Sequence, residues 1–251
     1  MVYTYDGSYE GLLSVVFATY ERRQPAQDIV EESRWQPSLF GAPISIATND
    51  THVQRVRQGL AKRCGSDVNR MLYHCFLSEQ SQIEMLIYRF VVLATGSEEN
   101  VLDNFREPVV LQMHRTERQI HREVHRMHAF VRFQETQDGL YAALVNPDFN
   151  VLPLLGPHFR DRYPAFRWLI YDTKRHYGLY HENHATRFVT LSADRPRHLP
   201  NDWLTSAETD YQTLWQTYFR SVDIPERRNM KLHLQHVPQR YWKYLVEKGN
   251  F

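Results

Sequence analysis

Hydrophobic and polar positions alternate over the first residues and then change to a helical spacing. Val2–Asp6 has the two-residue period that is typical of a short strand. Ser8 follows in the position of an N-cap, and the next residues predict an amphipathic helix over Tyr9–Arg22. The positions expected to face inward on that helix are Leu12, Leu13, Val16 and Phe17.

The same patterns predict the remaining elements. Gln24–Pro43 contains three prolines and few periodic apolar positions, so we expect an irregular connection there. Helices are predicted at Thr51–Arg63, Asp67–Leu77, Ser81–Leu93, Pro108 to about Val131, and Ser206–Arg220. Strands are predicted at Ile44–Thr48, Phe130–Glu135, Leu140–Asn146, Phe166–Asp172, Gly178–His181 and Arg187–Leu191.

This order of elements predicts an α+β fold. We expect a mixed or antiparallel sheet with several packed helices, in a single compact unit. The early strand-helix-strand-helix order suggests a small α/β layer, and Gln137-Asp138-Gly139 predicts a hairpin turn. The whole chain, 1–251, is taken as one domain, with a loose subdivision into 1–104 and 105–251.

Composition narrows the class of protein further. No apolar run approaches the length of a membrane span, and the first residues lack a secretory signal, so we expect a soluble cytoplasmic protein without a membrane partner. Cys64 and Cys75 are too few for a disulfide framework, a four-cysteine zinc site or an iron–sulfur cluster, and buried thiols are expected. The ten glycines form neither a Rossmann fingerprint nor a Walker loop. We therefore predict no cofactor and no metal.

Charge is unevenly distributed along the chain. Residues 1–104 carry 9 Lys and Arg against 13 Asp and Glu, whereas residues 105–251 carry 21 against 16. Arg outnumbers Lys by 25 to 5. Arg suits bidentate phosphate binding and stacking on bases, although a GC-rich genome explains the excess equally well.

The predicted helix from Pro108 has three distinct faces. Met113, Ile120, Val124, Met127 and Val131 form its core face. The adjacent face carries His114, His121, His125 and His128, and the next carries Arg115, Arg118, Arg122 and Arg126.

Three interpretations of these faces stay open. The histidines could bind a metal, because H-x-x-x-H places two imidazoles on successive turns, but a third ligand is not visible in the sequence. The His and Arg faces could instead line an anionic groove for a nucleic-acid backbone. A boundary of half-buried histidines beside solvated arginines has the same pattern.

Two further segments are candidates for phosphate binding. Ile224–Tyr244 interleaves basic and aromatic residues, which suits backbone neutralisation with base stacking, but a docked C-terminal segment would have the same sequence. In Gly156–Tyr163, Arg160 and Arg162 could hold a phosphate, or Asp161 could pair with an arginine.

An ordered series of short segments carries a family resemblance. It begins with Tyr3–Leu13 and continues through the segments Pro37–Gly41, Phe76–Glu79, Ile87–Arg89, Glu123–Met127, Phe130–Phe133, Asn146–Phe149, His158–Pro164, Leu214–Phe219 and Pro238–Leu245. Over essentially its whole length, the chain resembles a bacterial family labelled as DNA metabolism or DNA repair proteins.

The resemblance implies a DNA transaction without naming a reaction. Members of that family accompany a radical-SAM protein, and related domains are fused ahead of a uracil-DNA glycosylase-like domain. Since a radical-SAM cluster needs three thiolates and this chain has two cysteines, such chemistry would belong to the partner.

We therefore predict a DNA-associated accessory protein that binds single-stranded or damaged DNA and acts with a radical-SAM partner. Alternatives are a nucleotide- or DNA-processing enzyme with a site around His121, His125, Asp148 and Asp161, or a protein–protein adaptor. No catalytic residue is assigned. The predicted nucleic-acid-binding residues are Arg118, Arg122, Arg126, His125, Arg160, Arg162, Arg227, Arg228, Lys231, Arg240, Tyr241, Trp242 and Lys243.

Overall fold

The computed structural model describes residues 1–36, 42–190, 199–221 and 229–248, and these form two compact units. The first unit is Met1–His121 and the second is Arg122–Phe251. Among the described residues, no helix combines the length and apolar character needed to cross a membrane.

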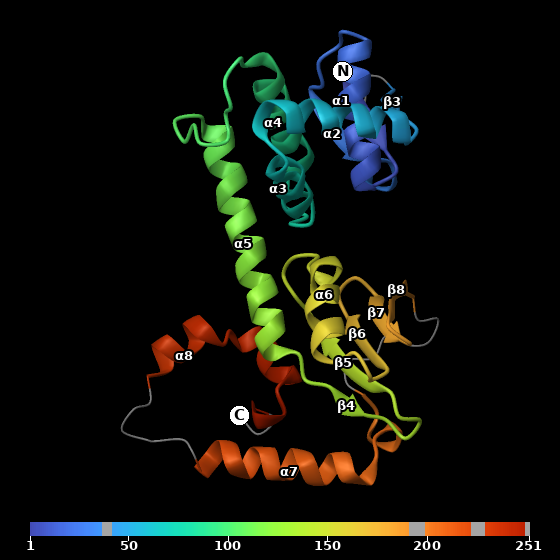
Figure 1. Cartoon of the computed structure of the whole chain (residues 1–251), viewed down its shortest axis with the longest axis vertical. Coiled ribbons are helices and arrows are strands. Elements are labelled where there is room, and N and C mark those ends of the chain that lie inside the picture. The colour runs from blue at the N-terminus through green and yellow to red at the C-terminus, as the bar shows by residue number, and fades with distance from the viewer. Residues whose placement is uncertain (37–41, 191–198, 222–228, 249–251) are drawn as a thin grey trace. The chain divides into compact units, whose positions relative to one another are not determined.

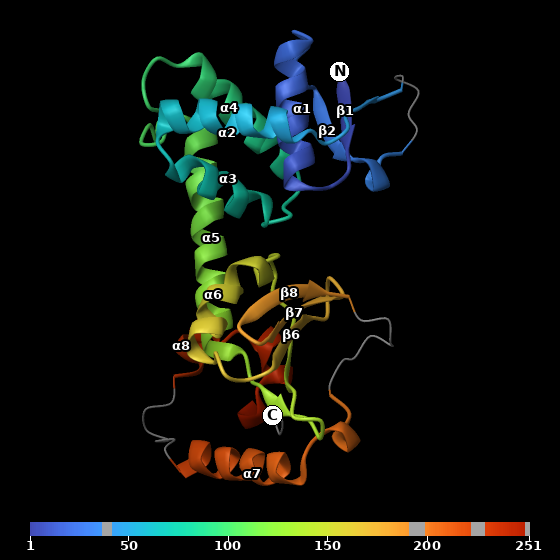
Figure 2. The same ribbon diagram turned by 45° about the vertical axis from the view of Figure 1, so that its right-hand side comes forward.

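The N-terminal alternation forms the central strand of a parallel three-stranded sheet in the first unit. β1 (Val2–Tyr5) lies between β2 (Asp28–Glu31) and β3 (Ile44–Ser45). α1 (Tyr9–Glu21) follows β1 and lies beside β1 and β2 in Figure 2. As predicted, the Ser8 hydroxyl caps α1, accepting a hydrogen bond of 2.9 Å from the Gly11 amide.

Four more helices complete the first unit, which Figure 1 shows in blue to green. They are α2 (Asp50–Cys64), α3 (Asp67–Phe76), α4 (Ile83–Gly96) and the first half of α5 (Pro108–Phe130). Their apolar faces bury one hydrophobic core together with α1 and the sheet. α2, α3 and α5 begin and end within one residue of their predicted bounds, whereas α4 begins two residues and ends three residues later than predicted.

The second unit contains a mixed five-stranded sheet in the order β4-β5-β6-β7-β8. The strands are β4 (Gln134–Glu135), β5 (Tyr141–Val145), β6 (Trp168–Asp172), β7 (Tyr177–Glu182) and β8 (Ala185–Val189). The predicted hairpin joins β4 to β5, and Gly139 adopts the positive φ of 76° that its turn requires.

One parallel pair in this sheet depends on a helix. β5 and β6 run parallel, and α6 (Leu152–Arg162) makes the connection between them, beside the sheet in Figure 1. The C-terminal elements are α7 (Ser206–Ser221), α8 (Met230–His236) and a 3₁₀ turn over Gln239–Tyr244. The α+β class with a mixed sheet and several packed helices is confirmed.

Three segments differ from their predictions. The strand expected over Phe130–Glu135 is confined to Gln134–Glu135, because Phe130 is the last residue of α5. Gln24–Pro43 is not wholly irregular, because Asp28–Glu31 pairs with β1 as a strand. α6 was not predicted, because its sequence contains Pro153 and Pro157, which usually argue against a helix. Pro153 stands in the first turn, where no intrahelical N–H is needed, and only Pro157 lies in the interior. Two predicted features extend beyond the described residues. They are the end of the strand predicted over Arg187–Leu191, at Leu191, and the family-resemblance segment Pro37–Gly41.

Candidate functional site

An aromatic pocket of about 560 Å³ opens in the second unit. It is lined by residues from the β4 and β5 region, from the end of α6 to β6, and from α7. Seven of its lining residues are aromatic, namely Phe133, Tyr141, Tyr163, Phe166, Trp168, Tyr211 and Trp215. We call this the aromatic pocket.

Edge-to-face contacts hold several of these rings in place. Phe133 meets Tyr163 with ring centroids 5.7 Å apart, and Tyr141 meets Phe166 at 5.1 Å. Trp168 is fully buried and stacks on His181 at 5.0 Å, with the two planes 13° apart. Contacts between rings therefore hold five of the seven lining aromatic residues in place.

Two hydrogen-bond donors on lining residues have no partner. The indole nitrogen of Trp168 and the Nε of Arg132 are buried, and neither meets an acceptor within the described part of the chain. Buried polar groups in folded proteins are nearly always paired, so each such group calls for an explanation. An acceptor supplied by a ligand would provide one.

The other nitrogens of Arg132 are fixed by the protein. Nη2 donates to Glu247 at 2.9 Å, and Nη1 donates to the Ala129 carbonyl at 2.7 Å. Glu247 also accepts a hydrogen bond of 3.1 Å from the indole of Trp215. Burial acts to raise the pKa of Glu247, but the hydrogen bonds from Arg132, from its own backbone amide and from Trp215, together with the charge of Arg132, outweigh burial. The pKa is therefore lowered and the carboxylate stays charged.

Arg162, one of the predicted binding residues, lies next to this pocket. It is exposed at the end of α6, and its Nε donates to the hydroxyl of the lining residue Tyr163 at 3.2 Å. Its guanidinium carbon is 5.6 Å from the centroid of the Tyr163 ring. The structure thus places a cation beside the aromatic wall.

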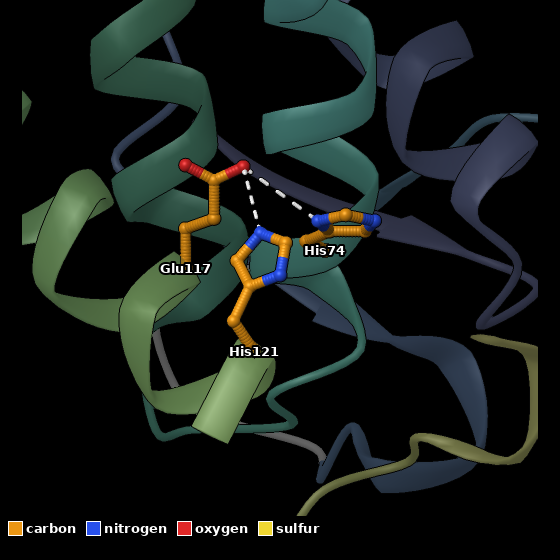
Figure 3. A group of neighbouring side chains, drawn as sticks. All are labelled: His74, Glu117 and His121. Atoms are coloured by element: carbon orange, nitrogen blue, oxygen red, sulfur yellow. Dashed lines mark ion pairs between the residues drawn. The ribbon is translucent and has the colours of Figure 1, made fainter. Parts of the chain in front are cut away.

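A second cluster lies in the first unit and consists of His74, Glu117 and His121. Figure 3 shows both rings turned toward one oxygen of the Glu117 carboxylate. Nδ1 of His74 is 3.6 Å from that oxygen, and Nε2 of His121 is 3.7 Å from it. One ligand-type atom from each residue lies within 4.8 Å of the others, so the group is of a kind that could hold a metal ion.

Two helices position this cluster. Glu117 and His121 stand four residues apart on α5, which places them on one face of that helix. His74 comes from the buried face of α3. Contact with the His74 ring is the main cause that lowers the pKa of Glu117, and the charge of His121 adds to it.

The predicted histidine face of α5 separates into four environments. His121 joins the cluster just described, whereas His114 makes a 2.9 Å hydrogen bond with the Leu102 carbonyl. His128 stacks on His158 with centroids 3.9 Å apart. His125 is exposed. His121 belongs to the possible metal-binding group together with His74 and Glu117. Its partner in the H-x-x-x-H pattern, His125, does not belong to that group.

Glu123, which sequence reasoning left unassigned, organises a buried polar network in the second unit. Its carboxylate accepts hydrogen bonds from Tyr241 at 2.5 Å, from Arg240 at 3.1 Å and from the Asp148 amide at 2.8 Å. Arg126 lies 3.6 Å from the same group. The structure therefore gives Arg126, Arg240 and Tyr241 structural partners, and Tyr241 is only 2% exposed.

The remaining predicted binding residues each have their own surroundings. Arg160 pairs with Asp161 at 3.2 Å. Trp242 is half-buried, and its indole donates to the Val237 carbonyl at 3.0 Å. Arg118, Arg122, Lys231 and Lys243 are exposed, whereas Arg227 and Arg228 fall outside the described residues.

The carboxylates of the predicted enzyme site have separate partners. Asp148 pairs with Arg240 at 2.8 Å, and Asp161 pairs with Arg160. Neither carboxylate belongs to the cluster that contains His121. The signal that sequence reasoning missed is Glu117, which stands four residues before His121. His74 and the pocket are products of tertiary packing.

Comparison with family models matches residues 81–247 to DUF4130, a domain of unknown function. No curated protein and no solved structure matches the chain. The DNA-repair label, the radical-SAM partner and the glycosylase fusion that the resemblance implies stay predictions. Because the match spans more than half of the 251 residues, the chain belongs to the DUF4130 family.

Proposed function

We propose that this protein is a DNA-associated accessory protein that binds single-stranded DNA and takes one unstacked base into the aromatic pocket. The observation that carries the proposal is a pocket with seven aromatic residues and two unpartnered buried donors in its lining. Its volume lies within the range of small-molecule sites in proteins.

The chemistry of the pocket suits a nucleobase. Every base has a flat π face, and stacking on an aromatic side chain contributes about 1–3 kcal/mol per base. A base also carries carbonyl oxygens and ring nitrogens at its edge, which accept hydrogen bonds. Trp168 Nε1 and Arg132 Nε lie buried in the lining residues, so a small shift of the pocket wall would be needed for these two donors to meet such an edge.

The charge near the pocket suits the phosphate that follows a base. Arg162 stands at Tyr163 with its side chain exposed. The second unit as a whole carries 18 Lys and Arg against 14 Asp and Glu, a net charge of +4. The sequence predicts further phosphate contacts by Arg118, Arg122, Lys231 and Lys243, and their roles stay predictions.

Fluorescence anisotropy with a labelled oligothymidylate tests the proposal on the full chain. Phe166→Ala removes a ring that is 48% exposed from the pocket wall, and Phe188→Ala removes a ring that is 57% exposed and does not line the pocket. We expect Phe166→Ala to weaken binding about 5- to 100-fold, because a stacking partner is lost, whereas Phe188→Ala keeps the original affinity. Equal affinity of both variants would contradict the base site.

The predicted contact between Arg162 and a phosphate is tested by comparing two arginine variants. Arg162 and Arg187 both lie over tyrosine rings, at 5.6 Å and 4.9 Å, but only the tyrosine beneath Arg162 lines the pocket. We expect Arg162→Ala to reduce the slope of log affinity against log salt by about 0.7, the value for one phosphate of a single strand. Arg187→Ala should leave the slope unchanged, and an unchanged slope in both would rule out this contact.

One observation favours a second candidate function, that of a protein–protein adaptor. Tyr211, Leu214, Trp215 and Tyr218 follow a helical spacing on α7 and are between 42% and 66% exposed. Such a row of exposed apolar residues is typical of a partner-binding surface. The radical-SAM protein implied by the family resemblance is the partner we propose for it.

Leu214→Glu separates the two functions, since Leu214 belongs to the α7 row and does not line the pocket. We expect this variant to lose co-purification with the co-expressed radical-SAM protein while its affinity for the oligothymidylate is unchanged. Co-purification of the variant at the original yield would contradict the adaptor role of α7.

A further inference from the structure

We propose that His74, Glu117 and His121 form a binding site for one divalent transition-metal ion of the zinc class. The site lies wholly in the first unit and is independent of the aromatic pocket. It combines two imidazole nitrogens with one carboxylate, which is a donor set that zinc and its neighbours in the periodic table accept.

The spacing of the donor atoms is close to what a tetrahedral ion needs. Zinc binds nitrogen and oxygen at about 2.0–2.1 Å, so two ligand atoms of a tetrahedral site lie roughly 3.3 Å apart. The two histidine nitrogens are 3.6 and 3.7 Å from the Glu117 oxygen, and all three atoms lie within 4.8 Å of each other. Small side-chain rotations would bring them to bonding distance.

Hydrogen bonding does not account for the arrangement. Distances of 3.6 and 3.7 Å exceed the 2.7–3.2 Å of an ordinary hydrogen bond between nitrogen and oxygen. Nδ1 of His74 is buried and has no hydrogen-bond partner in the described part of the chain. A cation between the rings and the carboxylate would satisfy this nitrogen and both of the other groups.

The cluster is accessible from one side. The His121 side chain is 57% exposed, whereas those of His74 and Glu117 are 10% and 18% exposed. An ion can therefore enter past His121 and be held against the buried pair. Three protein ligands leave a fourth tetrahedral position for solvent, which is the pattern of catalytic rather than structural zinc sites.

The neighbouring thiol does not join the donor set. Cys75 is buried, and its sulfur donates to the Met113 carbonyl at 3.4 Å. Burial also raises the pKa of this thiol, which disfavours the thiolate that zinc would require. The site is accordingly assigned two nitrogens and one oxygen.

Metal titration of the untagged full chain tests the inference. After treatment with EDTA and its removal, the protein is titrated with Co²⁺, followed by visible absorption, and with Zn²⁺, followed by calorimetry. We expect one ion per chain and a cobalt spectrum that Zn²⁺ displaces. His121→Ala and Glu117→Gln should each weaken binding at least 100-fold, because each removes one of three ligands.

His125→Ala is the matched control, since His125 is an exposed histidine one turn further along α5 and outside the cluster. This variant should bind like the original chain. The exposure of His121 makes His121→Ala compatible with folding, which circular dichroism checks. Absence of stoichiometric binding, or full binding by His121→Ala, would overturn the site. Oligothymidylate binding by His121→Ala should be unchanged, so the result is separable from the proposed function.

Discussion

Glu123 shows how much a single residue can organise in this chain. Its carboxylate is 1% exposed and is surrounded by donors from the C-terminal turn and from the segment after β5. A buried charge is tolerated only when it is paired and hydrogen-bonded. Tyr241 and Arg240 therefore owe their positions to this carboxylate.

Glu123→Gln keeps the shape of the side chain and removes its charge. Because Arg126 then loses its counterion and Arg240 keeps only Asp148, we expect the free energy of unfolding to fall by about 1–3 kcal/mol. Urea denaturation followed by circular dichroism measures this loss. Glu98→Gln, at an exposed position, should change stability by less than about 0.5 kcal/mol, and equal stability of the two variants would contradict the role of Glu123.

His128 makes stability depend on pH. Burial, with the nearby charges of His158 and His125, lowers the pKa of His128 to about 4, whereas an unfolded histidine titrates near 6.5. Between these values the unfolded chain binds a proton that the native chain does not. The contribution of His128 is therefore complete above pH 6.5 and is lost as the pH falls toward 4.

His128→Phe removes this proton linkage. Between pH 7 and pH 5, the original chain should lose about 1–2 kcal/mol more stability than the variant, with allowance for partial solvent screening. Urea denaturation at both values provides the measurement, and His236→Gln, at an exposed position away from His128, should retain the original pH dependence. An identical pH dependence for His128→Phe and the original chain would disprove the assignment.

The candidate metal site was only half visible at the level of residues. His121 belongs to the face of α5 that the helical period predicts, and Glu117 lies one turn before it. His74 is separated from them by α4 and its flanking loops, and only the packing of α3 against α5 brings it near. A helical period describes neighbours on one helix and contains no information about the helix opposite.

Among whole elements, α1 is the clearest case of a local signal that decides structure. The Ser8 hydroxyl satisfies an amide at the start of the helix, and Asp6 accepts a hydrogen bond of 2.6 Å from that hydroxyl. Ser66 occupies the corresponding position before α3 but makes no side-chain capping bond. The two serines thus form a natural comparison.

Ser8→Ala should lower the free energy of unfolding of the chain by about 1 kcal/mol, because α1 loses its capping bond. Ser66→Ala should have an effect of no more than a few tenths of a kcal/mol, since no such bond exists there. Thermal and urea denaturation of the two variants provide the comparison. A larger loss for Ser66→Ala than for Ser8→Ala would refute the argument.

The elements that sequence patterns missed depend on distant partners. β2 has four residues, and its strand geometry is set by pairing with β1 along Val2–Tyr5. α6 accommodates Pro157 in its interior while Leu155 and Phe159 are buried in the second unit. In both cases tertiary contacts outweigh the local sequence preference. In α1 and α5 the local preference and the tertiary contacts agree, so the sequence pattern alone predicts these helices.

At the scale of the whole molecule, charge differs between the two units. The first carries 12 Lys and Arg against 15 Asp and Glu, a net charge of −3, and the second has a net charge of +4. A polyanion such as DNA is attracted to the positive unit, which also contains the aromatic pocket. The division of charge therefore agrees with the proposed location of base binding.

Hydrogen exchange with and without the oligothymidylate tests that location over the whole chain. We expect slower amide exchange in the segments 131–141, 163–168 and 208–215, because a bound base would cover these pocket walls. Exchange in 50–76 of the first unit should be unchanged. Protection confined to the first unit would show that the strand binds elsewhere.

The aromatic pocket also has an optical consequence. Trp168 and Trp215 are two of the five tryptophans in the chain, and both line it. Trp168 lies stacked against His181, away from bulk water, whereas Trp215 is more exposed. A base that stacks on the exposed ring of Trp215 would quench the emission of that indole and change its wavelength. The protein thus contains its own fluorescent reporter, and occupancy of the pocket can be followed without attaching a dye.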